Sequence, residues 1–128
     1  MSTHDKMIDK GRTTRRSVLG GAYVDVAKRS TSAFSEPFQQ LITEAAWGRV
    51  WSRDTITKRE RSMMTIALLA ALGHHDELEL HLKATANTGA SAEDIREALL
   101  HVAIYAGVPA ANSAMKIAQR VLKERDEV

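Results

Sequence analysis

The stretch that decides the fold is Met63-Met64-Thr65-Ile66-Ala67-Leu68-Leu69-Ala70-Ala71-Leu72. Its apolar side chains leave no polar stripe at helical spacing, so they predict a helix that is surrounded on all sides. The run is too short to span a bilayer, and no membrane segment is expected. A chain of 128 residues has little surface with which to surround a helix, so we expect contacts between the subunits of an oligomer.

Helical signals continue on both sides of this run, and no strand alternation accompanies them. Ser91 and Asp94 have the spacing of a capping box, and Gly89 is placed to end the helix before them. Ser35 and Thr57 are placed as N-caps of two further helices, and Gly20 and Gly21 interrupt the first helix. The predicted helices cover 13–30, 35–51, Thr57 to Leu72, 75–88, Ser91 to Ala106, and Pro109 through Leu122. The sequence therefore predicts an all-α fold of about six helices.

Composition narrows the possible functions. The chain has no Cys, which excludes disulfides, thiolate metal sites and thiol redox chemistry. The net charge is only +2, and the one compact basic cluster is Arg12 with Arg15 and Arg16, so no nucleic-acid partner is expected. Residues 1–12 are polar and lack an apolar leader, so we expect a flexible tail, one domain over 13–128, and a cytoplasmic protein.

His81 and Glu77 are the first candidates for chemistry. They are four residues apart and share one helix face. A neighbouring carboxylate is expected to raise the pKa of the histidine and to orient its ring, as a general acid requires. The alternative is a surface pair that contributes about a few tenths of a kcal/mol. His74 would join that face only if the helix were continuous past Gly73, so no metal site is expected.

Aromatic and sulfur side chains have plainer interpretations. Trp47 and Trp51, with the neighbouring methionines, suit a core or the wall of a pocket. His101 and Tyr105 are four residues apart and suit packing or an interface. No glycine-rich phosphate loop and no nucleophile elbow appears.

Five stretches occur in an order that is typical of one family. They are Arg15 to Gly20 followed by Tyr23-Val24-Asp25, Phe38 to Arg53 with Ala46-Trp47-Gly48 inside it, Arg61 to Leu72, Glu77 to Gly89, and Ile104 to Asn112. Together they resemble the carboxymuconolactone decarboxylase family, over about Arg12 to Leu122. Arg49, Asp54, Lys83, Thr88 and His101 depart from the usual family residues. Lys83 replaces an arginine, and the two differ in how they bind carboxylates, so a different substrate affinity or choice is expected if that position contacts the substrate.

The resemblance implies a fold, an assembly and a reaction. The subunit would be an all-helical, alkylhydroperoxidase-D-like domain in a ring-shaped homo-oligomer, commonly a hexamer. A small dicarboxylate lactone would lose CO2 to give 3-oxoadipate enol-lactone, during aromatic catabolism through protocatechuate and without a cofactor. Redox members of the wider superfamily use a Cys-x-x-Cys pair, which this chain lacks.

The reaction requires residues that bind carboxylates, stabilise an oxyanion and deliver a proton. His81 is the candidate donor to the oxyanion or general acid, and Glu77 would orient it or shuttle the proton. Further candidates for substrate binding are Arg61 with Arg15 or Arg16 for the carboxylates, Tyr105 and Asn112 for polar contacts, and Trp47 and Trp51 for the walls. The arginines could instead form ion pairs between subunits. The chain could also act on another lactone or acid, or be a non-catalytic helical oligomer.

Overall fold

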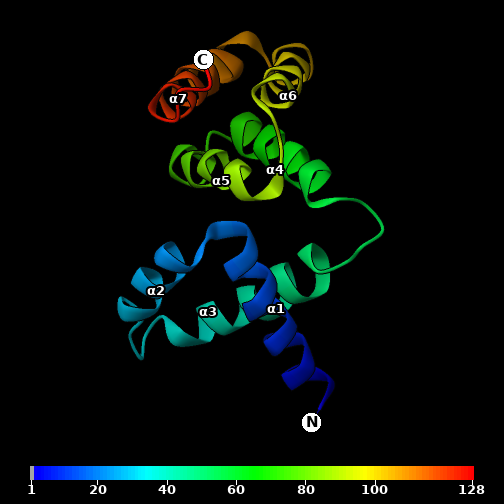
Figure 1. Cartoon of the computed structure of the whole chain (residues 1–128), viewed down its shortest axis with the longest axis vertical. Helices are drawn as coiled ribbons and strands as arrows, with labels where there is room; N and C mark the ends of the chain where they lie inside the picture. The colour runs from blue at the N-terminus through cyan, green and yellow to red at the C-terminus, as the bar shows by residue number, and fades with distance from the viewer. Residues whose placement is uncertain (1) are drawn as a thin grey trace. The chain divides into compact units, whose positions relative to one another are not determined.

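The computed structural model of the protein describes residues 2–128 (Figure 1). These residues form seven α-helices, one π-helix and no strand, which confirms the predicted all-α fold. In chain order the elements are α1 (Thr3–Leu19), α2 (Gly21–Arg29), α3 (Glu36–Ile42), the π-helix η1 (Thr43–Trp51), α4 (Lys58–Leu72), α5 (His75–Thr88), α6 (Ala92–Tyr105) and α7 (Val108–Glu124). None of these helices has both the length and the apolar character that crossing a membrane requires.

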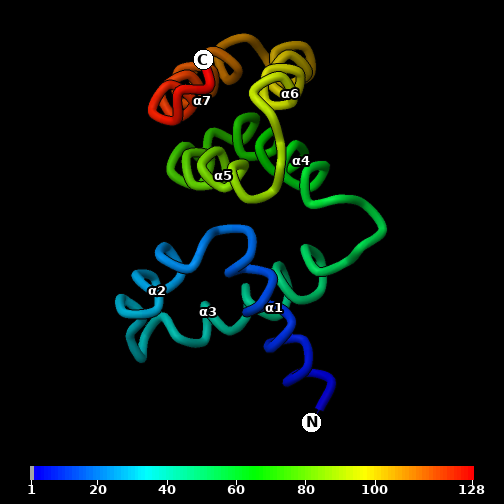
Figure 2. Tube along the Cα trace, in the orientation of Figure 1, coloured from blue at the N-terminus to red at the C-terminus, as the bar shows by residue number. Residues whose placement is uncertain are grey.

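Two compact units make up the chain. Met1–Thr57 carries α1 to η1, and Lys58–Val128 carries α4 to α7 (Figure 2). The predicted helices leave residues 52–56 as a connector, but the segment contains neither Gly nor Pro, so the sequence does not mark it as the boundary between two units. That the two units form one domain over 13–128 stays a prediction.

The N-terminal segment is helical, which corrects the prediction of a flexible tail over residues 1–12. In the first turn of α1, the Ser2 hydroxyl accepts a hydrogen bond from the Asp5 backbone N–H at 3.1 Å. Ile8 and Gly11 are buried, so this polar segment has an inner face that its composition conceals. Residue 1 lies outside the described range.

Glycine lies on both sides of the contact between α1 and η1. A Cβ atom on Gly11 would collide with the carbonyl oxygen of Thr43, and one on Gly48 would collide with the carbonyl oxygen of Met7. Because both obstacles are backbone atoms, a larger residue could be accommodated only by moving one helix away from the other. The first unit therefore depends on two glycines that are far apart in the sequence.

The helix predicted over 35–51 divides into α3 and η1. Its wider final turns still bring Trp47 and Trp51 together, with ring centroids 5.2 Å apart and both side chains buried. Ser35 occupies the N-cap position of α3, but its hydroxyl does not cap the helix. It accepts a hydrogen bond from the Ser32 backbone N–H at 2.9 Å instead.

The second unit consists of two helical hairpins, α4–α5 and α6–α7, which pack against each other (Figure 1). Its core is made of large aliphatic side chains that are almost fully buried: Ile66, Leu78, Leu82, Ile95, Leu99 and Val121. On α7, the buried side chains of Ala111, Ala114 and Ala118 are small enough to let neighbouring helices approach closely.

The ends of the helices in this unit follow the sequence signals. α5 covers the predicted 75–88, and Gly89 after it is left-handed with a φ of 87°. The predicted capping box is confirmed: the Ser91 hydroxyl accepts from the Asp94 N–H at 3.0 Å, and the Asp94 carboxylate accepts from the Ser91 N–H at 2.9 Å. Pro109 lies in the first turn of α7, as expected.

One face of α4 is not covered within the second unit, so enclosure of this helix on all sides, which is expected to involve contacts between subunits, stays a prediction. Ile66 and Ala70 are buried in the core. Met64, Leu68 and Leu72 follow one another at intervals of four residues and are 50%, 62% and 67% exposed. The other three helices of the second unit do not enclose every side of α4, so this apolar stripe is left uncovered within the unit.

Candidate active site

α5 presents Glu77 and His81 at the edge of the core. Leu78 and Leu82 are fully buried and fix the rotation of the helix about its axis. His81 adjoins this buried stripe and is half-buried, whereas Glu77, one turn earlier, is exposed. The imidazole therefore lies where the hydrophobic core meets the surface.

The pKa of His81 is opposite in direction to the sequence prediction. Burial lowers it from 6.5 to about 4, and the negative charge of Glu77 opposes this effect without outweighing it. The spacing in the sequence predicts that the Glu77 carboxylate lies near His81, but it does not predict that the imidazole is buried away from water. At pH 7 the ring is consequently neutral, with one N–H that donates and one nitrogen that accepts.

Ion pairs join α5 to its neighbours. Glu79 forms ion pairs with Arg120 on α7 and, at 3.8 Å, with Lys83 on its own helix. The hydrogen bond from Arg120 is the main reason why the pKa of Glu79 is lowered. Lys83, one of the departures from the family pattern, is thus part of a pair on the surface of α5.

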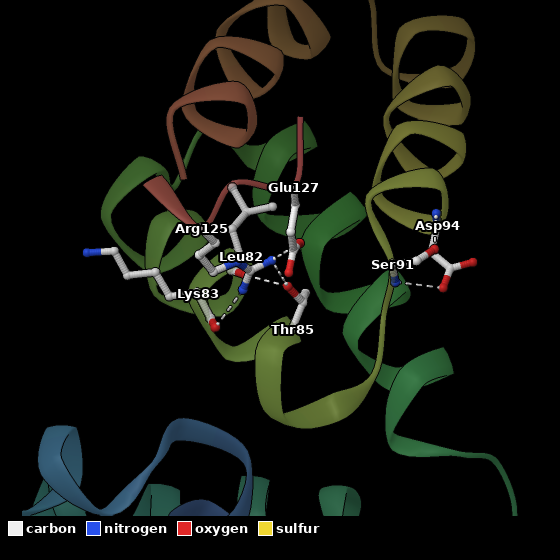
Figure 3. Close-up of polar contacts among 7 residues, drawn as sticks. All are labelled: Leu82, Lys83, Thr85, Ser91, Asp94, Arg125 and Glu127. Carbon is white, nitrogen blue, oxygen red and sulfur yellow. Dashed lines mark hydrogen bonds and ion pairs between the residues drawn. The ribbon is translucent and has the colours of Figure 1, made fainter. Parts of the chain in front are cut away.

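Arg125 holds the last turns of α5 and was not predicted from the sequence (Figure 3). Its guanidinium donates to the carbonyl oxygen of Lys83 at 3.2 Å and to the hydroxyl of Thr85 at 3.1 Å, while the Glu127 carboxylate accepts from it at 2.8 Å. A cation is favourable near the C-terminal end of a helix. No local pattern signals this role, because the partners on α5 lie about 40 residues earlier in the chain.

The three predicted carboxylate-binding arginines occupy different environments. Arg16 donates to both carboxylate oxygens of Asp25, at 2.9 and 3.3 Å, and this pairing lowers the pKa of Asp25. Arg15 is half-buried and lines a pocket of about 440 Å³ in the first unit. Arg61 is 8% exposed in the first turn of α4. Beside Arg61, the buried Ser62 donates a hydrogen bond to the hydroxyl of Thr88 at 2.7 Å, which fixes the start of α4 to the end of α5.

Two predicted polar contacts lie at the surface of the chain. Tyr105 is 85% exposed and stacks on His101 with ring centroids 5.9 Å apart, as expected from their spacing. Asn112 is exposed on α7. Both side chains are therefore left uncovered within the second unit.

The described residues contain no group of three or more His, Asp or Glu side chains arranged to hold a metal ion. His74 precedes α5 with a ψ of 77°, so the helix does not continue through it. This break takes His74 away from the face of Glu77 and His81.

The structure places Glu77 and His81 together on α5. The other candidates are divided between the units: Arg61, Tyr105 and Asn112 belong to the second unit, and Arg15, Arg16, Trp47 and Trp51 belong to the first. Their roles in binding stay predictions.

Comparison with known proteins identifies the family. The model of the carboxymuconolactone decarboxylase family matches residues 36–120. The chain is 42% identical to a 4-carboxymuconolactone decarboxylase of Acinetobacter baylyi over 115 residues, which cover 90% of this chain and 86% of the relative. It is 39% identical to a nitrosuccinic acid decarboxylase of Metarhizium robertsii over 121 residues, or 94% of this chain and 85% of the relative. The chain therefore belongs to the carboxymuconolactone decarboxylase family and is a decarboxylase.

Proposed function

We propose that the enzyme converts 4-carboxymuconolactone to 3-oxoadipate enol-lactone and CO2, in the breakdown of aromatic compounds through protocatechuate. The observation that carries this proposal is the 42% identity to the Acinetobacter baylyi enzyme over 90% of the chain. The half-buried histidine on α5 supports it, because the reaction requires a hydrogen-bond donor in a partly dry environment. The cytoplasm remains the predicted location.

The substrate carries its own electron sink, so this proposal includes no cofactor. When the bond to the γ-carboxylate breaks, CO2 leaves and the bonding electron pair stays on the γ-carbon. The pair delocalises through the ring double bond onto the lactone carbonyl oxygen, which gives a dienolate. A proton then adds to the carbon beside that carbonyl, and the double bond ends between the β- and γ-carbons, as in the enol-lactone.

His81 is assigned to the developing oxyanion. Its lowered pKa keeps the ring neutral at pH 7, so it donates a hydrogen bond through N–H and is not a cationic acid. A neutral donor does not attract the substrate carboxylates as an imidazolium would, and so it leaves them to the arginines. Glu77 orients the imidazole or shuttles the proton that reaches the carbon.

The carboxylate groups are assigned to guanidinium side chains. Arg61 and an arginine of α1, Arg15 or Arg16, match a carboxylate with two parallel hydrogen bonds. Arg61→Ala tests this role: a large rise in KM supports binding of the substrate, whereas a smaller oligomer with unchanged KM supports an ion pair between subunits. The roles of the remaining candidates, Tyr105 and Asn112 with Trp47 and Trp51, in substrate binding stay predictions.

The relative from Metarhizium robertsii supports a second candidate substrate class. Its name gives a dicarboxylic acid that carries a nitro group. Loss of CO2 from the carbon beside a nitro group leaves the electron pair on nitro oxygens, just as the lactone leaves it on a carbonyl oxygen. The second candidate is therefore another small dicarboxylate whose departing carboxylate is linked to an electron-withdrawing group.

A homo-oligomer, commonly a hexamer in the family, is part of the proposal. The exposed stripe of Met64, Leu68 and Leu72 on α4 supports it, because a second copy could cover these side chains. Light scattering of the purified protein tests the assembly. A monomer at micromolar concentration would contradict it.

The substrate assignment is tested by supplying 4-carboxymuconolactone and nitrosuccinic acid separately to the purified protein. Lactone consumption is followed by ultraviolet absorbance, and CO2 release is measured for both compounds. The proposal predicts a higher kcat/KM for the lactone. A higher value for nitrosuccinic acid favours the second class, and turnover of neither compound overturns both assignments.

A further inference from the structure

The pocket in the first unit is lined by Arg15 and Arg16, the two α1 arginines that the proposed function offers for the substrate carboxylates. It has a volume of about 440 Å³, which is within the range of sites for small molecules. Its lining comes from α1, α2, α3 and residues close to them. The charged side chains in this lining are Arg12, Arg15, Arg16 and Lys28, with Asp25 and Glu36. The pocket therefore has an excess of two positive charges at neutral pH.

The two acidic residues already have partners. Asp25 is held by the two-pronged ion pair with Arg16, at 2.9 and 3.3 Å. Glu36 accepts a hydrogen bond from the side-chain amide of Gln40 at 3.3 Å. Arg16 is thereby committed to joining α1 to α2, and the excess charge resides on the other cations.

Arg15 differs from its neighbour in the chain. It is half-buried, and its Nε atom is buried without a hydrogen-bond partner among the described residues. A buried donor that lacks a partner is unfavourable, and an anion in the pocket would offset that cost by binding the guanidinium. Among the described residues, Arg12 pairs with Asp9, at 3.4 Å between two exposed side chains, and such a contact contributes little. Arg12 can therefore turn toward a ligand at low cost.

We propose that this pocket binds a small dicarboxylate, with Arg15 holding one carboxylate bidentately and Arg12 and Lys28 holding the other. Two carboxylates match the excess of two positive charges, and the amides of Gln39 and Gln40 supply neutral donors in the same lining. The cations precede residues 36–120, the range matched by the family model, so they add a binding element to it. The inference rests on the proposed function, which supplies the class of ligand and offers Arg15 or Arg16 for its carboxylates; the pocket, the choice of Arg15 and the roles of Arg12 and Lys28 go beyond it.

The test is calorimetric titration of the full chain with cis,cis-muconate, a six-carbon dicarboxylate, and with propionate, a monocarboxylate. We expect muconate to bind and propionate to bind at least about tenfold more weakly. Arg15→Gln should raise the Kd for muconate at least about tenfold, since a hydrogen bond to a charged group is lost. Arg15→Lys should raise the Kd for muconate less, because lysine keeps the positive charge and loses only the bidentate hydrogen bonding of the guanidinium. Lys10→Gln is the matched control: it removes one exposed charge from α1 outside the pocket, so the Kd should not change.

Three results would overturn the inference: no binding of muconate, equal Kd values for wild type and Arg15→Gln, or equal binding of propionate and muconate. Circular dichroism checks that each variant folds. If Arg15→Gln does not fold, Arg12→Gln at its exposed position replaces it, and an unchanged Kd in that variant overturns the inference.

The inference and the proposed function fail separately. Binding of muconate that depends on Arg15, in a protein without lactone turnover, keeps the inference and removes the substrate assignment. Lactone turnover with an unchanged KM in Arg15→Gln keeps the assignment and removes the inference.

Discussion

Arg59, at the start of α4, donates two hydrogen bonds to the carboxylate of Asp94, at the start of α6. The Arg59 Nε and Nη2 atoms lie 2.7 and 2.6 Å from the two carboxylate oxygens of Asp94. The same carboxylate accepts from the Ser91 N–H in the capping box, so it serves two helices. Arg59 is the main reason why the pKa of Asp94 lies well below its usual value.

Replacing Asp94 should therefore remove two contacts at once. Asp94→Ala is expected to lower the melting temperature by several degrees, because α6 loses the side-chain half of its capping box and Arg59 on α4 loses its partner. Asp94→Asn retains a capping oxygen and should lower it less. Glu93→Ala, at the exposed neighbouring position, is the control and should have little effect. Equal melting temperatures for Asp94→Ala and wild type would show that the two contacts do not stabilise the unit.

Gly48 should not tolerate even one additional carbon atom. Gly48→Ala is expected to destabilise the protein by about 2 kcal/mol or more in urea denaturation, since its Cβ would meet the backbone of α1. Gly21→Ala is the control, because a Cβ there would meet only the flexible end of the Arg16 side chain. Alanine also favours a helix by about 1 kcal/mol over glycine, so the control should be neutral or stabilising. Similar losses in both variants would contradict the close crossing of α1 and η1.

Arg125 is expected to stabilise α5 from the far end of the chain. Arg125→Ala should cost about 1–2 kcal/mol in unfolding free energy, because it removes hydrogen bonds to Lys83 and Thr85 near the end of the helix. Lys123→Ala, at an exposed position in the last turn of α7, provides the comparison and should cost much less. Amide hydrogen exchange should locate the loss in residues 82–88. Unchanged protection there would argue against this role.

The neutral state of His81 predicts how stability depends on pH. The folded pKa of about 4 lies below the usual 6.5, so the unfolded chain binds more protons between these values. The contribution of His81 is complete above about pH 6.5, is lost as pH falls toward about 4, and amounts to at most about 3 kcal/mol. His81→Gln should flatten the dependence of unfolding free energy on pH in this window. An NMR titration of His81 near 6.5 in the wild type would contradict it.

The second unit follows local signals that can be read from the sequence. Gly89 ends α5, and Ser91 with Asp94 starts α6, because caps act within one turn of a helix. The first unit is harder to predict from local signals, because the need for glycine at positions 11 and 48 arises from the close contact between α1 and η1. The polar start of α1 similarly hides the inner face that contains Ile8.

The candidate site divides in the same way. Spacing alone places Glu77 and His81 on one face, and the structure confirms it. The direction of the pKa shift of His81 depends on burial, which is a tertiary property that no spacing reveals. Arg15 and Arg16 are adjacent and chemically identical in the sequence. The fold distinguishes them, because Arg15 is half-buried and Arg16 is exposed and paired with Asp25.

The most direct test of the account measures kcat for the lactone in His81→Gln. If His81 donates to the developing oxyanion, kcat should fall about 100-fold or more, with the melting temperature and the oligomer retained. His75→Gln, an exposed position on the same helix, should leave kcat unchanged. A folded His81→Gln protein with the kcat of the wild type would contradict the account.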